Sequence, residues 1–166
     1  MTTPITSSAA TNAIWTALYN LLNAQAMAGG KLATVKSVIM GAQFASQLVP
    51  AIAIDLESWN AQWFAARRRK VTIAYRIYVA ASSVQTATRI ANLKDARASL
   101  APILDDGNGN GIEPILGLPA NFAAGNIAWE GSLKSYRVAS EIREGENQEV
   151  WAYGIYDYEA ITFVTV

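Results

Sequence analysis

The sequence contains no cysteine and no histidine. The absence of cysteine excludes disulfide bonds, thiolate zinc sites and cysteine nucleophiles. The absence of histidine removes the commonest general base and the commonest ligand of transition metals, so a Ser-His-Asp triad cannot form. Both absences argue against an enzyme, and the sequence predicts no catalytic residue, no cofactor and no metal ligand.

Charge is also scarce. Charged residues make up 16% of the chain, whereas about 25% is usual in soluble domains. The 13 basic residues balance the 13 acidic ones, so the chain as a whole has no net attraction to nucleic acid or to an anionic membrane. Two explanations stay open for so few charges. One is an alanine-rich composition without structural meaning, and the other is a surface largely covered by copies of the chain or by partners.

Long apolar runs are missing as well. No stretch approaches the ~20 residues that span a bilayer, and the first residues, MTTPITSSAATN, lack the basic and apolar regions of a signal peptide. We therefore expect no membrane contact and a cytosolic compartment. A chain of 166 residues is long enough to form one domain with a substantial core.

Apolar periodicity predicts two helices. The first begins at Thr11 or Asn12, runs to about residue 27 and ends at two glycines, and residues 1–10 precede it as a flexible arm. The second covers about residues 83–104 and starts at a capping box of Ser82 and Gln85. The faces expected to be buried are Ile14, Leu18, Leu21 and Leu22 in the first helix, and Ile90, Leu93, Arg97 (through its aliphatic stem), Leu100 and Leu104 in the second.

Alternating and β-branched segments predict the strands, which cover residues 32–40, 50–56, 71–79, 132–142 and 149–166. The clearest is VTIAYRIYV, residues 71–79. We expect its Tyr75 and Ile77 to be buried under the helices, with Leu18 and Leu100 among their neighbours. The last strand carries an apolar face of Trp151, Tyr153 and Ile155, and its broken alternation around residues 156–159 predicts a bulge or bend there.

No strand-helix-strand unit recurs along the chain. The order of elements therefore favours an α+β fold, with an antiparallel β-sheet and two helices packed on one face. We expect a single domain over residues 1–166. Within it, residues 57–70 form a long interstrand loop, and the Gly-, Pro- and Asn-rich residues 105–125 form a mobile connection.

The stretch ILDDGNGNGIEP, residues 103–114, resembles a calcium-binding loop. Asp106, Asn108 and Asn110 alternate, and a glycine follows them. An EF-hand loop that began at Asp106 would need a bidentate glutamate at its twelfth position, where the sequence has Gly117. Prolines downstream also prevent a regular helix from following. The sequence therefore predicts a turn without a metal.

The segment 57–70 carries the strongest candidate site. It combines large aromatic side chains with a basic run in a segment expected at the surface, where exposed aromatics indicate a contact. Aromatics beside basic residues can bind nucleic acid, but the neutral chain favours a protein partner. The candidate interface residues are Trp59, Trp63, Phe64, Arg67, Arg68, Arg69 and Lys70.

A small ligand-binding domain or enzyme is the alternative of another class. It would use acidic side chains and an arginine, and a pocket lined by Asp55, Glu57 and Arg76 would support it. A solvated sheet face at the same residues would count against it.

The order of several segments, and the pattern of apolar and polar residues within them, resemble those of one known family. They are IWTALYNLL, then PAIAIDL, a long connection, VTIAYRIYVAAS, and a helix ending near LAPIL. Over about residues 12–104 this layout is similar to the tail terminator, or tail completion, proteins of long-tailed bacteriophages. The C-terminal strands match more loosely, which keeps a neck or connector adaptor open as an alternative.

The resemblance implies a structural virion protein without chemistry. Members of the family form a hexameric ring that caps the tail tube, ends its polymerisation and joins the tail to the head connector. The implied partners are copies of the chain, the tail tube protein and the head-tail connector or neck protein, while DNA only passes through the lumen. The implied location is the tail-neck region of the virion, and the host cytoplasm during assembly.

Overall fold

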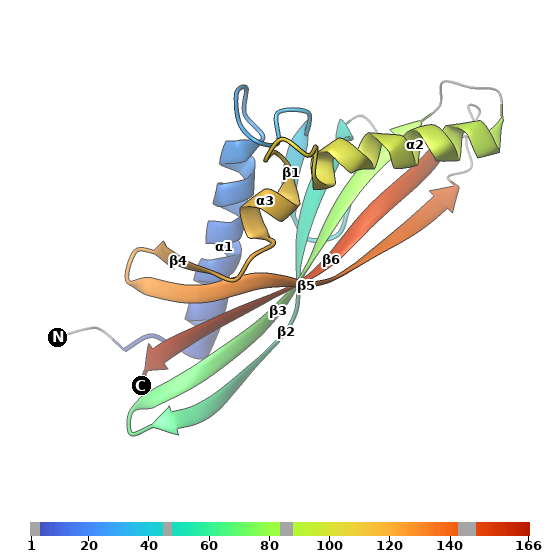
Figure 1. Ribbon diagram of the computed structural model, residues 1–166. Helices are drawn as coiled ribbons and strands as arrows, with labels where there is room; N and C mark the ends of the chain where they lie inside the picture. The colour runs from blue at the N-terminus through green and yellow to red at the C-terminus, as the bar shows by residue number, and fades with distance from the viewer. Residues whose placement is uncertain (1–3, 45–47, 84–87, 143–148) are drawn as a thin grey trace.

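The computed structural model describes residues 4–44, 48–83, 88–142 and 149–166, which form a mixed α+β structure (Figure 1). Six strands build a curled sheet in the order β1-β2-β3-β6-β5-β4, and three helices accompany it. The elements are α1 (Ser7–Gln25), β1 (Ser37–Met40), β2 (Ala51–Ala65), β3 (Arg68–Ser83), α2 (Arg89–Leu104), α3 (Ile112–Leu116), β4 (Ala120–Ala124), β5 (Ile127–Ile142) and β6 (Val150–Thr165). The predicted α+β class is confirmed.

The sheet is not purely antiparallel. β2, β3, β6, β5 and β4 pair antiparallel with their neighbours, whereas β1 pairs parallel with β2. β1 is also shorter than predicted, because residues 31–34 form a turn and only the last four residues of the segment 32–40 belong to the strand. The third helix and the short β4 were not predicted.

α1 begins earlier than predicted, so residues 7–10 are not part of an arm. The Thr6 side chain accepts a hydrogen bond from the backbone N–H of Ala9 and thereby caps the helix. Ser7 and Ala10 are buried. The polar, small residues of this segment looked like an arm because the N-cap, Thr6, lies well before Ile14, the first large apolar residue of the helix. Residues 1–3 lie outside the described part.

α2 begins later than predicted. Ser82 belongs to β3, and the helix is capped by Thr88, whose side chain accepts a hydrogen bond from the backbone N–H of Ala91. Gln85 lies outside the described residues. Ile90, expected in the buried stripe, is 84% exposed. Leu100 is buried as predicted, but the other buried residues of the helix are Asn92, Ala96 and Ile103, so the buried face is rotated relative to the predicted one.

Residues 105–125 contain ordered elements, which the sequence analysis did not predict. α3 and β4 both lie in this range, and Ile112 and Leu116 of α3 are fully buried. Pro114 does not prevent this helix, because the first backbone N–H groups of a helix have no intrahelical partner. Pro114 is the third residue of this five-residue helix, so its missing N–H group removes no intrahelical hydrogen bond.

The long interstrand loop expected at 57–70 does not exist. β2 continues to Ala65, β3 starts at Arg68, and a two-residue turn with Arg67 at a φ of 58° joins them. A β-bulge between Leu56 and Ser58 shifts the side-chain alternation by one residue. The apolar residues of this strand therefore change from even to odd positions, so a search for strict alternation does not recognise residues 51–65 as one strand.

The bulge expected in β6 is located in β5 instead. β3 and β6 pair without interruption, whereas β5 has a register shift between Leu133 and Ser135. The broken alternation of β6 has another cause, because the two faces of this strand are buried at different places. Trp151 packs into a small cluster with Val49, Ala51 and Ala80, while the opposite face, including Tyr156 and Tyr158, packs into the main core.

The main core confirms the predicted burial of β3. Tyr75 is 1% exposed and Ile77 is fully buried, and both belong to one apolar cluster with Leu18 of α1 and Leu100 of α2. The Tyr75 hydroxyl donates a hydrogen bond of 2.7 Å to the carbonyl oxygen of Thr11, and burial raises the pKa of this hydroxyl. Buried side chains of α3 belong to the same cluster. We call the side of the sheet that faces this cluster the helix side, and the opposite side the outer side.

Truncation of the core should be costly. We expect Ile77→Ala to lower the free energy of unfolding by about 2–5 kcal/mol, because this side chain is fully buried in the main core and its truncation leaves a cavity. Urea denaturation followed by circular dichroism measures this change. Ile90→Ala is the matched control and should cost less than about 0.5 kcal/mol, since this side chain lies in solvent. Similar losses for both variants would contradict the assignment of the helix faces.

Candidate interaction surface

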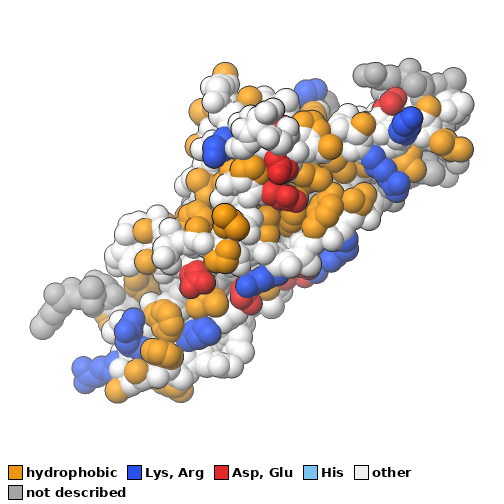
Figure 2. All heavy atoms as spheres, viewed as in Figure 1, with side chains coloured by type: hydrophobic (Ala, Val, Ile, Leu, Met, Phe, Trp, Pro, Cys, Tyr) orange, Lys and Arg blue, Asp and Glu red, His pale blue; other side chains and the backbone are white. Residues whose placement is uncertain are grey.

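All seven residues of the candidate interface lie together at the free end of the β2–β3 hairpin. In Figure 2 apolar and basic side chains lie next to each other at this end of the molecule. Trp59 is 46% exposed, Trp63 is 64% and Phe64 is 62%. We refer to these aromatics, together with residues 67–70 and the nearby Phe163 and Val166, as the hairpin end.

One part of the hairpin end lies on the helix side. Trp59 pairs with Ile73 and Trp63 with Arg69 across the ladder, and directly paired residues point to the same side of a sheet. The Arg69 guanidinium stacks over the Trp63 ring at 4.4 Å from its centroid. Trp59, Arg69, Val166 and the residues 4–8 line a cavity of about 310 Å³. The N-terminal segment therefore lies against the hairpin.

The other part lies on the outer side. Phe64 and Phe163 meet edge to face with ring centroids 4.9 Å apart, and the Arg68 guanidinium lies 5.5 Å from the centroid of Phe163. The backbone N–H of Val166 donates to the carbonyl oxygen of Arg67 at 3.0 Å, which fixes the C-terminal end of β6 beside the turn. Phe163 and Val166 were missed from the sequence because they lie about a hundred residues from the hairpin.

The basic run has no acidic partner within the described part of the chain. Each ion pair there belongs to Arg76, Lys134 or Arg137 and to acidic residues on β2 and β6. The four cations at 67–70 instead contact aromatic rings or solvent. The hairpin end thus presents aromatic surface and unneutralised positive charge together, which suits a partner with acidic groups.

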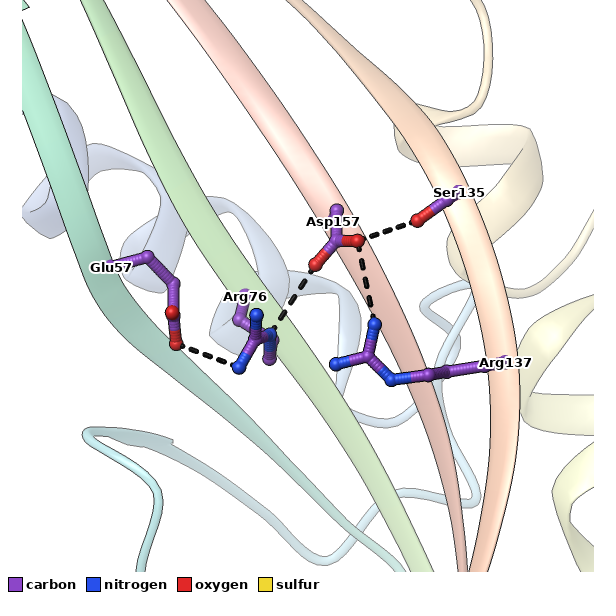
Figure 3. A network of polar contacts seen from close by, with 5 residues as sticks. All are labelled: Glu57, Arg76, Ser135, Arg137 and Asp157. Atoms are coloured by element: carbon purple, nitrogen blue, oxygen red, sulfur yellow. Dashed lines mark hydrogen bonds and ion pairs between the residues drawn. The ribbon is translucent and has the colours of Figure 1, made fainter.

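The polar residues of the sheet centre form a network on the outer side (Figure 3). Arg76 on β3 lies 3.1 Å from Glu57 on β2 and 3.3 Å from Asp157 on β6. Asp157 also accepts a hydrogen bond from the Ser135 hydroxyl and pairs with Arg137 at 3.5 Å. The Ser135 hydrogen bond, followed by the two arginines, holds the pKa of the Asp157 carboxyl below its usual range.

The network includes two of the three residues that were expected to line a pocket in a ligand-binding domain or enzyme. Glu57 and Arg76 pair with each other, and their side chains are 33% and 29% exposed. Asp55 is paired in register with Arg76 and so points to the same open side of the sheet. These three residues therefore form a solvated sheet face, the arrangement that counts against the alternative of a ligand-binding domain or enzyme.

The Asp157 network should make stability depend on acidic pH. Because the pKa of Asp157 is lowered in the folded chain, its contribution is present above the ordinary carboxyl pKa near 4 and is lost as pH falls through the lowered value. Asp157→Asn should reduce the melting temperature at pH 7 and have progressively less effect at lower pH. Glu130→Gln, which lies outside the network, is the control. An equal reduction at every pH would contradict this electrostatic origin.

The segment 103–114 uses its acidic side chains for backbone contacts. Asp106 accepts hydrogen bonds from the backbone N–H groups of Asn108 and Asn110, at 2.7 and 3.1 Å, and from the Asn110 side chain at 2.8 Å. These bonds lower the pKa of Asp106. No group of three or more acidic side chains that could hold a metal ion occurs among the described residues. None of the described helices is long and apolar enough to cross a bilayer.

Calcium should therefore leave the stability of the chain unchanged. The carboxylate oxygens of Asp106 already accept hydrogen bonds, and the twelfth-position ligand is missing. We expect the same melting temperature with millimolar calcium and after addition of a chelator, measured by circular dichroism. A rise of several degrees in calcium would show that this loop is a metal site.

A second open region lies between α2, α3 and β5. Two adjoining grooves of about 480 and 330 Å³ share Tyr136, which is 41% exposed, and Val138 beside it is 48% exposed. Leu104 and Leu118 line the same region. The rings of Tyr136 and Tyr156 lie 4.7 Å apart, and the Tyr156 hydroxyl donates to Glu113 at 2.7 Å. Burial, more than this bond, raises the pKa of Tyr156. No pattern in the sequence indicated this region.

The chain matches no protein-family model, and no curated protein matches it.

Proposed function

We propose that the chain is a structural virion protein, the tail terminator of a long-tailed bacteriophage. Six copies form a ring that caps the tail tube, ends its polymerisation and joins the tail to the head connector. The observation that carries the proposal is the hairpin end. It exposes Trp59, Trp63 and Phe64 beside cations without an acidic partner in the described part of the chain.

The exposed aromatics support an assembly role because they are stabilised little within their own chain. Large aromatic side chains dominate the energetics of protein interfaces. In addition, β2 and β3 carry these side chains on a rigid hairpin, so little conformational freedom would be lost on contact. The low charge content supports the same role, since interface cores are depleted of charged residues.

The mechanism of the ring is steric. Each copy contacts the next through two different surfaces, as cyclic symmetry requires beyond a dimer. One face of the ring matches the end of the tube, and the opposite face offers no place for a further tube subunit. Polymerisation therefore ends, and the free face receives the connector.

DNA passes through the lumen of the proposed ring without tight binding. A chain with zero net charge does not hold DNA strongly. The basic run of the hairpin end meets acidic groups of a neighbouring virion protein or lies along the DNA channel. The proposal includes the fold of the family, with helices against one side of the sheet. It is supported by the single core that α1, α2 and α3 share with the strands.

Removal of the two most exposed aromatics of the hairpin tests the function. Trp63→Ala combined with Phe64→Ala should leave the circular dichroism of the monomer nearly unchanged, since both side chains are more than half exposed. The variant should fail to form rings or to join tails. The measurements are native mass in solution, and tail length and yield of joined particles when the variant replaces the chain in the phage.

A matched variant controls for the loss of apolar surface as such. Met27→Ala combined with Ile90→Ala removes two side chains that are 64% and 84% exposed elsewhere, and it should assemble normally. If the hairpin variant unfolds, Trp63 and Phe64 belong to the core of the domain. If it folds and still completes tails, the hairpin end is not the interface.

A further inference from the structure

The two outermost long strands of the sheet each leave an edge open. β1 pairs only with Ala51–Ile54 of β2, and β4 pairs only with Ile127–Gly131 of β5. Beyond these points, no strand in the described part of the chain pairs with the outer edge of β2 or of β5. Both strands continue for about ten more residues, and so each exposes a row of backbone donors and acceptors that another strand can use.

The open edge of β2 lacks the features that normally prevent strand addition. Between the bulges at Glu57 and Phe64, the segment Ser58–Trp63 is regular and contains no charged residue, proline or glycine. Soluble proteins usually protect such edges with charges, prolines or bulges. An uncharged, regular edge of six residues with two exposed tryptophans is therefore suited to pairing with a partner strand.

The open edge of β5 offers a complementary surface. After the bulge at Lys134, the strand is regular through Ala139. Its two cations do not protect the edge, because Lys134 pairs with Glu159 and Arg137 with Asp157 on the neighbouring strand β6. On the helix side, Tyr136 and Val138 are partly exposed along the groove that they line together with α2, since α2 packs mainly on β3 and β6.

The two edges match each other in strand direction and in the side on which their aromatic residues lie. Three antiparallel pairings separate β2 from β5, so the two strands run in opposite directions, and copies in the same orientation would join them as an antiparallel pair. Trp59 and Trp63 lie on the helix side of β2, and Tyr136 and Val138 lie on the helix side of β5. A shared sheet would therefore place the exposed tryptophans of one copy in the groove of the next.

We propose that neighbouring copies of this chain assemble by strand addition, the β2 edge of one copy pairing antiparallel with the β5 edge of the next. The contact is heterologous, so every added copy leaves one open edge of each kind until a ring closes. The inference rests on the proposed function, because it states how the ring is held together. It goes further by assigning the two surfaces and their pairing.

The positions of the open edges also determine how the strands lie in the ring. The register places Leu56 beside Tyr75, Tyr75 beside Tyr158 and Tyr158 beside Leu133. Leu56 and Leu133 are therefore at the same level. The open part of β2 extends from this level in one direction and that of β5 in the other. Pairing requires each copy to be staggered along the strands relative to the last, so the strands tilt with respect to the ring axis, as in closed β-barrels.

Thiol cross-linking tests this pairing without background, because the chain has no cysteine. Asn60→Cys on β2 is combined with Ala139→Cys on β5, both on the outer side, and the protein is treated with a short, flexible bis-maleimide. Denaturing gels should show a ladder from dimer upward. Each single variant should show no species above background. Thr16→Cys combined with Ala139→Cys, which moves one thiol to an exposed position of α1, should give no ladder.

Sedimentation of the untreated protein separates the outcomes. A ring-sized mass without a ladder from the double variant overturns the edge pairing and leaves the proposed ring intact. Dimers from Asn60→Cys alone show two β2 edges paired about a two-fold axis, which overturns the heterologous contact. A monomer without cross-links at all concentrations overturns self-pairing in solution, and the tail-joining assay then decides the proposed function separately.

Discussion

The long strands of this sheet extend beyond the region on which the helices pack, and the rest of the structure depends on this difference in length. β2, β3, β5 and β6 each have 15 or 16 residues, whereas α2 lies mainly against β3 and β6, and α1 lies toward the other end (Figure 1). The middle of the sheet is closed by the core around Tyr75 and Ile77. The ends of the hairpin and of β5 remain open, and their aromatic side chains are partly exposed.

The distribution of charge follows the same division. On the outer side, the acidic residues of β2 and β6 neutralise Arg76 and Arg137 at the centre of the sheet. At the hairpin end, cations lie over aromatic rings instead. Opposite charges that are paired on an open face contribute little to binding, while positive charge beside exposed aromatics is free to act on a partner. The charges at the centre of the sheet thus pair with one another, whereas those at the hairpin end remain available for a partner.

Much of the fold was accessible from the sequence wherever burial on one side produced a regular pattern. Tyr75 and Ile77 were placed correctly because β3 is covered on the helix side along most of its length and alternates without a bulge. The seven candidate interface residues lie toward one end of a strand hairpin and on both of its sides, and not on a loop. The pattern failed at the bulge near Glu57 and at the capped start of α1, where local backbone geometry changes the relation between position and burial.

The sequence by itself determined the α+β class, the central strand and the lack of histidine and cysteine chemistry, because composition and periodicity are local properties of the chain. Only the tertiary structure decided which apolar residues stay exposed. Ile90 and Leu100 both fit a helical stripe, yet only Leu100 faces the core, while Ile90 is 84% exposed. Tyr136 and Val138 are open because α2 lies over the neighbouring strands. Exposure depends on which elements cover which strands, and that is set by contacts between residues far apart in the chain.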